Sequence, residues 1–134
     1  MFKISRRLDY GIQLMIALAS EPQQTPIPTA SLAKKLQIPL PFMHQIGHTL
    51  MQAGLIKASP GPRGGLRLNQ PPEEISLLKI AEVLEGPIYV NSCLECGDSC
   101  PHEEDCTAQP VWRNIQVTVK DYLASTYLAS LARN

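Results

Sequence analysis

At 134 residues, the chain is long enough for one compact domain and too short for two full ones. Hydrophobic residues make up 44% of it and charged residues 18%, and no apolar run approaches the roughly 20 residues that cross a bilayer. These properties exclude a membrane-spanning helix. Because the amino terminus also lacks a signal-peptide pattern, we expect a cytoplasmic protein without membrane contact, whose thiols are reduced.

The formal net charge of zero hides two halves of opposite sign. Residues 1–68 carry eight Lys and Arg against two acids, a balance of +6, and residues 69–134 carry four against ten, a balance of −6. A basic half suits a polyanionic partner, which the acidic half would repel. The alternative is a chance asymmetry between solvated faces.

The amino-terminal part of the chain predicts a pair of helices after a first one. Apolar residues at helical spacing predict a first helix that ends near Ser20, followed by a proline-rich loop over 21–28. Thr29 is placed to cap a short helix, and Pro41 suits the first turn of the next, which Gly54 ends. Two helices joined by a short turn are typical of a helix-turn-helix unit, although periodicity alone also fits any helical hairpin.

A glycine-rich hairpin is predicted to follow this pair of helices. Short strands are expected over 55–58 and 66–69, and the loop between them carries Arg63. A basic hairpin directly after the second helix indicates the winged variety of the motif. Because the glycines lie between two strands, they do not form a phosphate-binding loop, and with no catalytic constellation visible we expect no enzyme.

The carboxy-terminal part predicts one short helix and one long helix. Ser76 is placed to cap a helix over 77–85 that Gly86 closes, and a glycine-free segment over 108–133 follows the cysteines. The long segment has the spacing of two-helix packing at Trp112, Ile115, Val119, Tyr122, Thr126 and Ala129. A helix of about 25 residues would be about 37 Å long, more than this domain needs internally, so we expect a dimer contact. A helix folded back on its own core is the alternative.

These elements together predict a mainly α fold with a small β-wing. We expect a winged helix-turn-helix DNA-binding domain over 1–86, a cysteine-rich cluster-binding loop over 87–107, and a long C-terminal dimerisation helix over 108–134.

All four cysteines of the chain lie in one acidic stretch with the spacing Cys-x2-Cys-x3-Cys-x5-Cys: Cys93, Cys96, Cys100 and Cys106. A short loop with cysteines two to five residues apart can converge its thiolates on an iron–sulfur cluster. Structural zinc sites more often use two Cys pairs separated by a dozen or more residues. Zinc, with or without His102, and a metal-free thiol switch are the alternatives.

The order of motifs along the chain resembles one known family. A Gly-Pro-Arg-Gly-Gly-Leu-Arg-Leu wing follows a Pro-Phe-Met-His-Gln-Ile helix, and Val-Trp-Arg heads the segment after the cysteines. Over nearly the whole chain, this order resembles the bacterial winged helix-turn-helix regulators of the IscR and NsrR type. The resemblance implies a homodimer that holds its second and third helices and its wing against double-stranded DNA. It also implies a 2Fe–2S or 4Fe–4S cluster, bound by three cysteines and one other ligand.

The resemblance implies individual ligands. Cys100 and Cys106 fall on the family's ligand positions, whereas Cys93 is displaced by one residue and Cys96 is extra, so these two compete for the third place. Asp9 occupies the place of an aspartate ligand in NsrR-type regulators. Its other interpretation is an early-helix carboxylate that complements the helix dipole.

Eight residues are expected to contact DNA. The alternative for each is that it is an ordinary solvated surface residue. Contacts to phosphates, which position the protein, are expected from Lys34, Lys35, Lys57 and Arg67. Residues nearer to base edges, on the second helix of the motif in the major groove and at the wing tip in the minor groove, are His44, Gln45, His48 and Arg63.

We therefore expect a DNA-binding transcriptional regulator, a repressor, that senses redox, nitric oxide or iron–sulfur status through a cysteine-ligated cluster. A metal-free or zinc-dependent regulator of the same fold is the alternative. A small iron–sulfur electron carrier or scaffold is a rival from another class, and it predicts no salt-dependent binding to duplex DNA.

Overall fold

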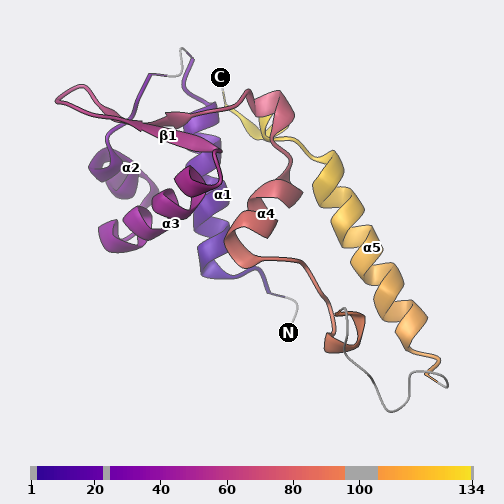
Figure 1. The fold of residues 1–134 in the computed structure, drawn as a ribbon. Coiled ribbons are helices and arrows are strands. Elements are labelled where there is room, and N and C mark those ends of the chain that lie inside the picture. The colour runs from indigo at the N-terminus through magenta and orange to yellow at the C-terminus, as the bar shows by residue number, and fades with distance from the viewer. Residues whose placement is uncertain (1–2, 23–24, 96–105, 134) are drawn as a thin grey trace.

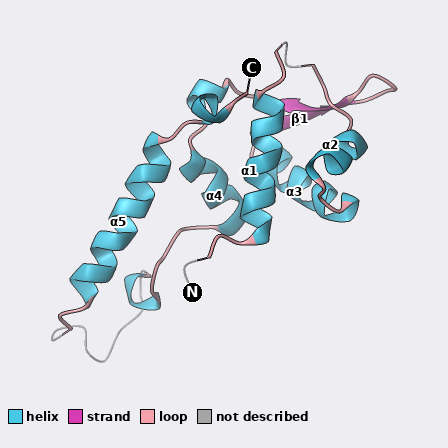
Figure 2. Ribbon diagram, turned by 180° about the vertical axis from the view of Figure 1, so that it is seen from behind, coloured by secondary structure: helices cyan, strands magenta, loops and turns pink. Residues whose placement is uncertain are grey.

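The computed structural model describes residues 3–22, 25–95 and 106–133 (Figure 1). The helices and strands, in chain order, are α1 (Arg6–Ala19), α2 (Thr29–Leu36), α3 (Leu40–Gln52), β1 (Ile56–Ser59), β2 (Gly65–Leu68), α4 (Leu77–Glu85) and α5 (Gln109–Ser125). The short 3₁₀ helices are Pro72–Glu74, Ser92–Leu94 and Leu128–Leu131. The predicted mainly α fold with a small β-wing is confirmed (Figure 2).

Helix α1 is the centre of the hydrophobic core. It contacts α2, α3 and α4, and both views place α4 between α1 and α5 (Figures 1 and 2). Leu14 and Met15 of α1 and Ile46 of α3 have no exposed surface. Burial of a side chain of this size contributes about 1.5–3 kcal/mol, so α1 holds the helix-turn-helix unit and α4 together as one body.

Serine side chains cap two of the helices. The Ser5 hydroxyl accepts from the Leu8 amide at 3.0 Å, and the Ser76 hydroxyl accepts from the Lys79 amide at 3.1 Å, which confirms the predicted cap of α4. The predicted cap at Thr29 is wrong, because Thr29 is the first residue of α2 and Pro28 occupies the cap position without a side-chain bond. An isolated bridge between Ile27 and Leu66 already fixes the chain direction there.

The wing is an antiparallel hairpin that is tied to the body by a third segment. Leu66 pairs with Ala58 across the hairpin, and it exchanges backbone hydrogen bonds of 2.8 and 2.9 Å with Ile27 on its other side. A side chain at Gly65 would overlap the Ile27 carbonyl, so this close approach requires glycine. Both strands lie within one residue of their predicted positions.

The predicted helix of about 25 residues over 108–133 is wrong, because α5 ends after 17 residues at Ser125. Thr126 is extended, and its carbonyl accepts from the Leu77 amide at 2.9 Å. The Leu128 amide donates to the Ile75 carbonyl at 2.8 Å, and the Leu128 side chain is fully buried. These long-range contacts outweigh the local preference for helix and turn the tail back onto the amino-terminal domain. Helix α5 is therefore about 26 Å long.

No helix within residues 3–22, 25–95 and 106–133 combines the length and the apolar character that a membrane span requires.

Candidate nucleic-acid interface and cysteine loop

Helix α3 has one buried face and one polar face. Met43, Ile46 and Leu50 are fully buried, whereas the three residues predicted to lie near base edges, His44, Gln45 and His48, are exposed. The exposed residues follow the helical repeat on the side away from the core. The structure therefore presents these three side chains together on one accessible face.

A tight turn sets the angle between α2 and α3. Gln37, at the end of α2, is in the left-handed conformation with φ 58° and ψ 41°, and the Ile38 amide donates to the Ala33 carbonyl at 2.9 Å. Ile38 is buried, which anchors the turn to the core. Lys34 and Lys35 are exposed in the last turn of α2, on the solvent side of this corner.

The wing brings two cations directly opposite each other. Lys57 of β1 pairs with Arg67 of β2, so both side chains project from the same face of the hairpin. Lys57 is exposed, and the Arg67 Nε is buried without a hydrogen-bond partner. Like charges at opposite positions are destabilising, and an anion bound between them would relieve the repulsion.

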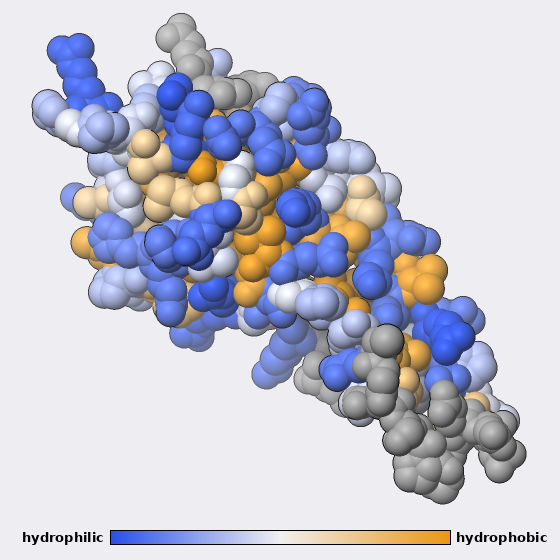
Figure 3. Space-filling view, viewed as in Figure 1, coloured by the Kyte–Doolittle hydropathy of each residue, from blue (hydrophilic) through white to orange (hydrophobic). Residues whose placement is uncertain are grey.

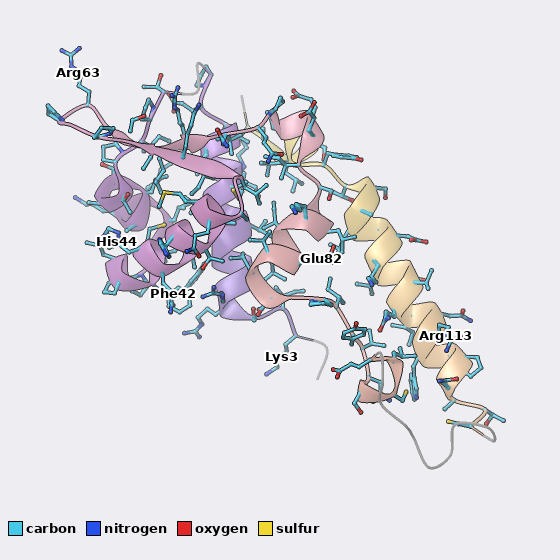
Figure 4. All side chains as sticks on the ribbon, viewed as in Figure 1. Lys3, Phe42, His44, Arg63, Glu82 and Arg113 are labelled. Atoms are coloured by element: carbon cyan, nitrogen blue, oxygen red, sulfur yellow. The ribbon has the colours of Figure 1, made fainter. Side chains whose placement is uncertain are left out.

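All eight predicted DNA-contacting residues belong to a stretch of the chain without acids. No Asp or Glu occurs between Glu21 and Glu73, whereas five Lys and Arg lie in that interval. Arg63 extends from the wing tip, and His44 lies on α3 on the side of the molecule away from α5 (Figure 4). The surface formed by α2, α3 and the wing therefore attracts a polyanion.

The cysteine loop starts and ends at the other side of the molecule. Cys93 lies in the 3₁₀ turn Ser92–Leu94 and Cys106 lies shortly before α5, and both are partly buried. The amide of Val90 donates to the side chain of Gln116 on α5 at 3.1 Å, which ties the start of the loop to the helix at its end. The turn Ser92–Leu94, which includes Cys93, lies at the end of α5 that follows Cys106 in the chain (Figure 1).

The other predicted ligands lie elsewhere. Cys96 and Cys100 fall outside the described residues, and Asp9 is exposed in the first turn of α1. Within the described ranges, no three His, Cys, Asp or Glu side chains gather in one place. The donor set itself fits an iron–sulfur cluster, because one loop supplies four thiols within fourteen residues and its start is tied to α5 through Val90.

Helix α5 has an apolar face that is open to solvent. No residue of α5, all of which the structure describes, is buried. Val111, Val119 and Tyr122 are 51%, 39% and 68% exposed and lie on one side of the helix, and a shallow groove on this side is lined by residues that include Ile115 and Val119 of the predicted packing seam. Apolar side chains interrupt the hydrophilic surface along this helix (Figure 3). An apolar stripe of this kind marks an interaction surface.

Sequence reasoning missed the polar residues that connect the helices. Gln116 ties the cysteine loop to α5, and Arg7 and Thr49 are hydrogen-bonded to each other across 42 residues of sequence. No local pattern marks such contacts. Arg7 belongs to the short basic run at the amino terminus, which indicates charge but not a partner.

Comparison with known proteins places the chain among transcriptional regulators. The family model described as "Rrf2: Iron-dependent Transcriptional regulator" matches residues 4–134. The HTH-type transcriptional regulator CymR of Bacillus subtilis is 34% identical over 130 residues, which cover 97% of this chain and 89% of CymR. The HTH-type transcriptional regulator IscR of Vibrio campbellii is 26% identical over 132 residues, covering 98% and 78%.

Solved structures agree with the sequence matches. CymR (YrzC), described as the global cysteine regulator of B. subtilis, superposes with a TM-score of 0.81 over 99% of this chain and 100% of that one, at 34% identity. The IscR of T. potens gives a TM-score of 0.79 over 97% of this chain and 85% of that one, at 27% identity.

The cation pair in the wing generates a prediction about stability. We expect Lys57→Glu to raise the free energy of unfolding by about 0.5–1 kcal/mol, because a repulsive cross-strand pair becomes an attractive one. The gain should shrink as salt is added, since the pair is partly exposed and screened. Urea unfolding at fixed protein concentration measures it. In an Arg67→Gln background the same substitution should give no gain, and an equal gain in both backgrounds would contradict the pairing.

Proposed function

The chain belongs to the Rrf2 family and is a DNA-binding transcriptional regulator rather than an enzyme; from this premise we propose that it is a homodimeric repressor controlled through its cysteine loop. The observation that carries the proposal is the segregation of charge. A stretch with five cations and no acid forms α2, α3 and the wing, whereas every cysteine lies in an acidic loop between α4 and α5. DNA attracts the first surface and repels the loop.

The polar face of α3 would enter the major groove. Gln45 can make a bidentate hydrogen-bond pair with an adenine, and His44 and His48 lie beside it on the same face. The cations of α2 and the wing, Lys34, Lys35, Lys57 and Arg67, would contact phosphates, and Arg63 would reach the minor groove. The repulsion between Lys57 and Arg67 is relieved in this complex, because a phosphate supplies the missing anion.

A second copy of the chain would cover the apolar face of α5. An exposed stripe that includes Val119 and Tyr122 on a helix outside the core suits isologous pairing with its own copy. Such a dimer presents two α3 helices to two half-sites, which suit the major groove when they lie about 34 Å apart or a multiple of that distance. Repression would follow from occupation of this paired site.

The cysteine loop would hold a 2Fe–2S or 4Fe–4S cluster. Cys100 and Cys106 are the proposed ligands together with Cys93 or Cys96, and Asp9, from the same or the other protomer, is the proposed fourth. A bound cluster supplies sensitivity to oxidants and nitric oxide. The hydrogen bond between Val90 and Gln116 holds the start of the loop against α5. A rearrangement within 91–106 would therefore displace α5 and the end of α4. We infer a cytoplasmic location, where the thiols stay reduced.

A metal-free response is the second candidate. It is favoured by the match to CymR, which at 34% is more similar in sequence than the IscR of V. campbellii and whose solved structure is described as that of a cysteine regulator. In this version the thiols of the same loop would be oxidised directly. An electron carrier is set aside, because the chain belongs to a family of transcriptional regulators.

DNA recognition is tested on duplexes selected from a randomised pool by the wild-type protein. We expect Lys35→Gln to weaken binding to all duplexes alike and to lower the slope of log affinity against log salt by about 0.9, because one phosphate contact is lost. Gln45→Ala should instead reduce discrimination at one base position by roughly tenfold, with the slope unchanged. Lys79→Gln, on the exposed side of α4, is the charge-matched control. Binding without salt dependence or sequence preference would refute this part of the proposal.

The cluster is tested by anaerobic reconstitution with iron and sulfide. We expect visible charge-transfer absorption and bound iron and sulfide in the wild type, and the loss of both in Cys106→Ala. Asp9→Ala should retain a cluster with an altered spectrum, whereas Asp121→Ala, an exposed carboxylate on α5, should leave the spectrum unchanged. Zinc in place of iron would contradict the cluster. A protein without metal whose DNA affinity changes on thiol oxidation would establish the second candidate.

The dimer is tested by placing a charge on the apolar face of α5. Tyr122→Asp should convert the dimer to a monomer in sedimentation experiments, because the carboxylate would be buried without a partner at the interface. Tyr127→Asp is the matched control, since Tyr127 is 42% exposed but lies beyond the end of α5. A dimer that tolerates Tyr122→Asp and Val119→Asp alike would place the interface elsewhere.

A further inference from the structure

One side chain of α1 contacts both α3 and the end of α4. The Nε of Arg7 donates to the Leu84 carbonyl at 3.1 Å, and its Nη2 donates to the Thr49 hydroxyl at 3.0 Å. The Thr49 hydroxyl in turn donates to the Gln45 carbonyl at 3.1 Å. A single partly buried guanidinium therefore joins α1, α3 and α4, and it does so next to a residue of the proposed base-reading face.

A glycine one turn along α1 makes this contact possible. Gly11 lies four residues after Arg7 and therefore on the same face of the helix. A side chain at Gly11 would overlap the Leu84 side chain and lie 3.6 Å from the Ile46 Cγ2. Because glycine leaves this space open, α4 packs close enough to α1 for Arg7 to reach the Leu84 carbonyl.

The chemistry of the contact requires an arginine. Leu84 is the penultimate residue of α4, so its carbonyl has no partner within the helix and lies at the negative end of the helix dipole. A cation is favoured at this position. The planar guanidinium donates in two fixed directions, whereas a lysine ammonium is a single point charge on a longer stem. The guanidinium therefore fixes the directions of its two hydrogen bonds, which the rotating ammonium of a lysine does not.

The end of α4 is also the beginning of the cysteine loop. The helix finishes at Glu85, Gly86 follows with φ 81°, and the chain then runs to Cys93. A displacement of this segment moves the Leu84 carbonyl. Arg7 carries that movement to Thr49, whose second hydrogen bond is to the backbone of Gln45.

We propose that Arg7 is a positioning residue for DNA recognition: it fixes the base-reading face of α3 relative to the end of α4, so that face follows the start of the cysteine loop. The inference rests on the proposed function, because it takes α3 to be the base-reading helix. This role of Arg7 differs from a phosphate contact. A positioning residue controls the discrimination between DNA sequences, and it leaves the salt dependence of DNA affinity unchanged.

The first experiment compares Arg7→Gln with Arg6→Gln, which removes the same charge from the exposed neighbouring residue. Affinities are measured for the duplex selected by the wild type and for its single-base variants, over a range of salt concentrations. We expect Arg7→Gln to lose roughly tenfold in discrimination with an unchanged salt slope, and Arg6→Gln to keep the wild-type discrimination. A uniform loss on all duplexes, with the slope lowered by about 0.9, would show a phosphate contact and overturn the proposal.

A second set of variants separates positioning from a loss of folding. Thr49→Val removes the partner of Arg7 at constant size, and Thr49→Ser keeps the hydroxyl. We expect Thr49→Val to reproduce the loss of discrimination, Thr49→Ser to retain it, and the Arg7→Gln/Thr49→Val double variant to lose no more than either single one. Additive losses would mean that the two residues act independently, which the proposal excludes. Circular dichroism melting verifies that each variant is folded.

The link to the loop is tested at Gly86. Alanine there is strained by the positive φ but meets no atom within 4 Å, so it disturbs the end of α4 without touching α3. We expect Gly86→Ala to change base discrimination in the wild-type background and to have no effect in the Arg7→Gln background. An equal effect in both backgrounds would refute transmission through Arg7. A wild-type protein that binds all duplexes equally would refute the proposed function itself.

Discussion

The packing of α1 against its neighbours is the constraint on which the other elements depend. Leu14 and Met15 are fully buried in α1, and the helix contacts α2, α3, α4, β2 and the turn Leu128–Leu131. Truncation of one such side chain typically costs about 2–5 kcal/mol, a large part of the 5–15 kcal/mol that stabilises a domain of this size. The surface of α2, α3 and the wing and the return of the carboxy-terminal tail therefore both depend on packing against α1. The arrangement also explains why α1 can carry a residue such as Arg7 that contacts two other helices.

The basic and the acidic residues of the chain occupy different elements of the fold. The five cations between Glu21 and Glu73 belong to α2 and the wing, while ten of the twelve acids follow residue 72. Surface charges are screened beyond about 8–10 Å at moderate salt, so the charges close to a bound polyanion decide its attraction. A protein of zero net charge whose two signs are separated turns its basic side to a polyanion. Neutrality and DNA binding are compatible because the two signs occupy different elements.

Sequence patterns correctly predicted the structural features that depend on residues close together in the chain. The cap at Ser76, the glycine end of α3 and the wing hairpin depend on residues within a few positions of one another, and all three are as predicted. The end of α5 depends on two hydrogen bonds to a segment about 50 residues earlier, in which the Thr126 carbonyl accepts and the Leu128 amide donates. Helical periodicity does not register these bonds, so it predicted a helix that is too long. The resemblance to a family of regulators, based on motif order, is confirmed. The contacts of Arg7 span 42 and 77 residues, and no sequence spacing specifies them.

The early end of α5 gives α4 a central role in the molecule. Leu77 at the start of α4 binds the carbonyl of Thr126, just beyond α5, and Leu84 near its end binds Arg7. The cysteine loop leaves from that second end and is tied to α5 through Val90 and Gln116. A continuous helix through residue 133 would have left the first end of α4 without this anchor. Because α4 is held at both ends, a displacement of the loop would not be absorbed by one loose helix: the proposal has it pass to α5 through Gln116 and to α3 through Arg7.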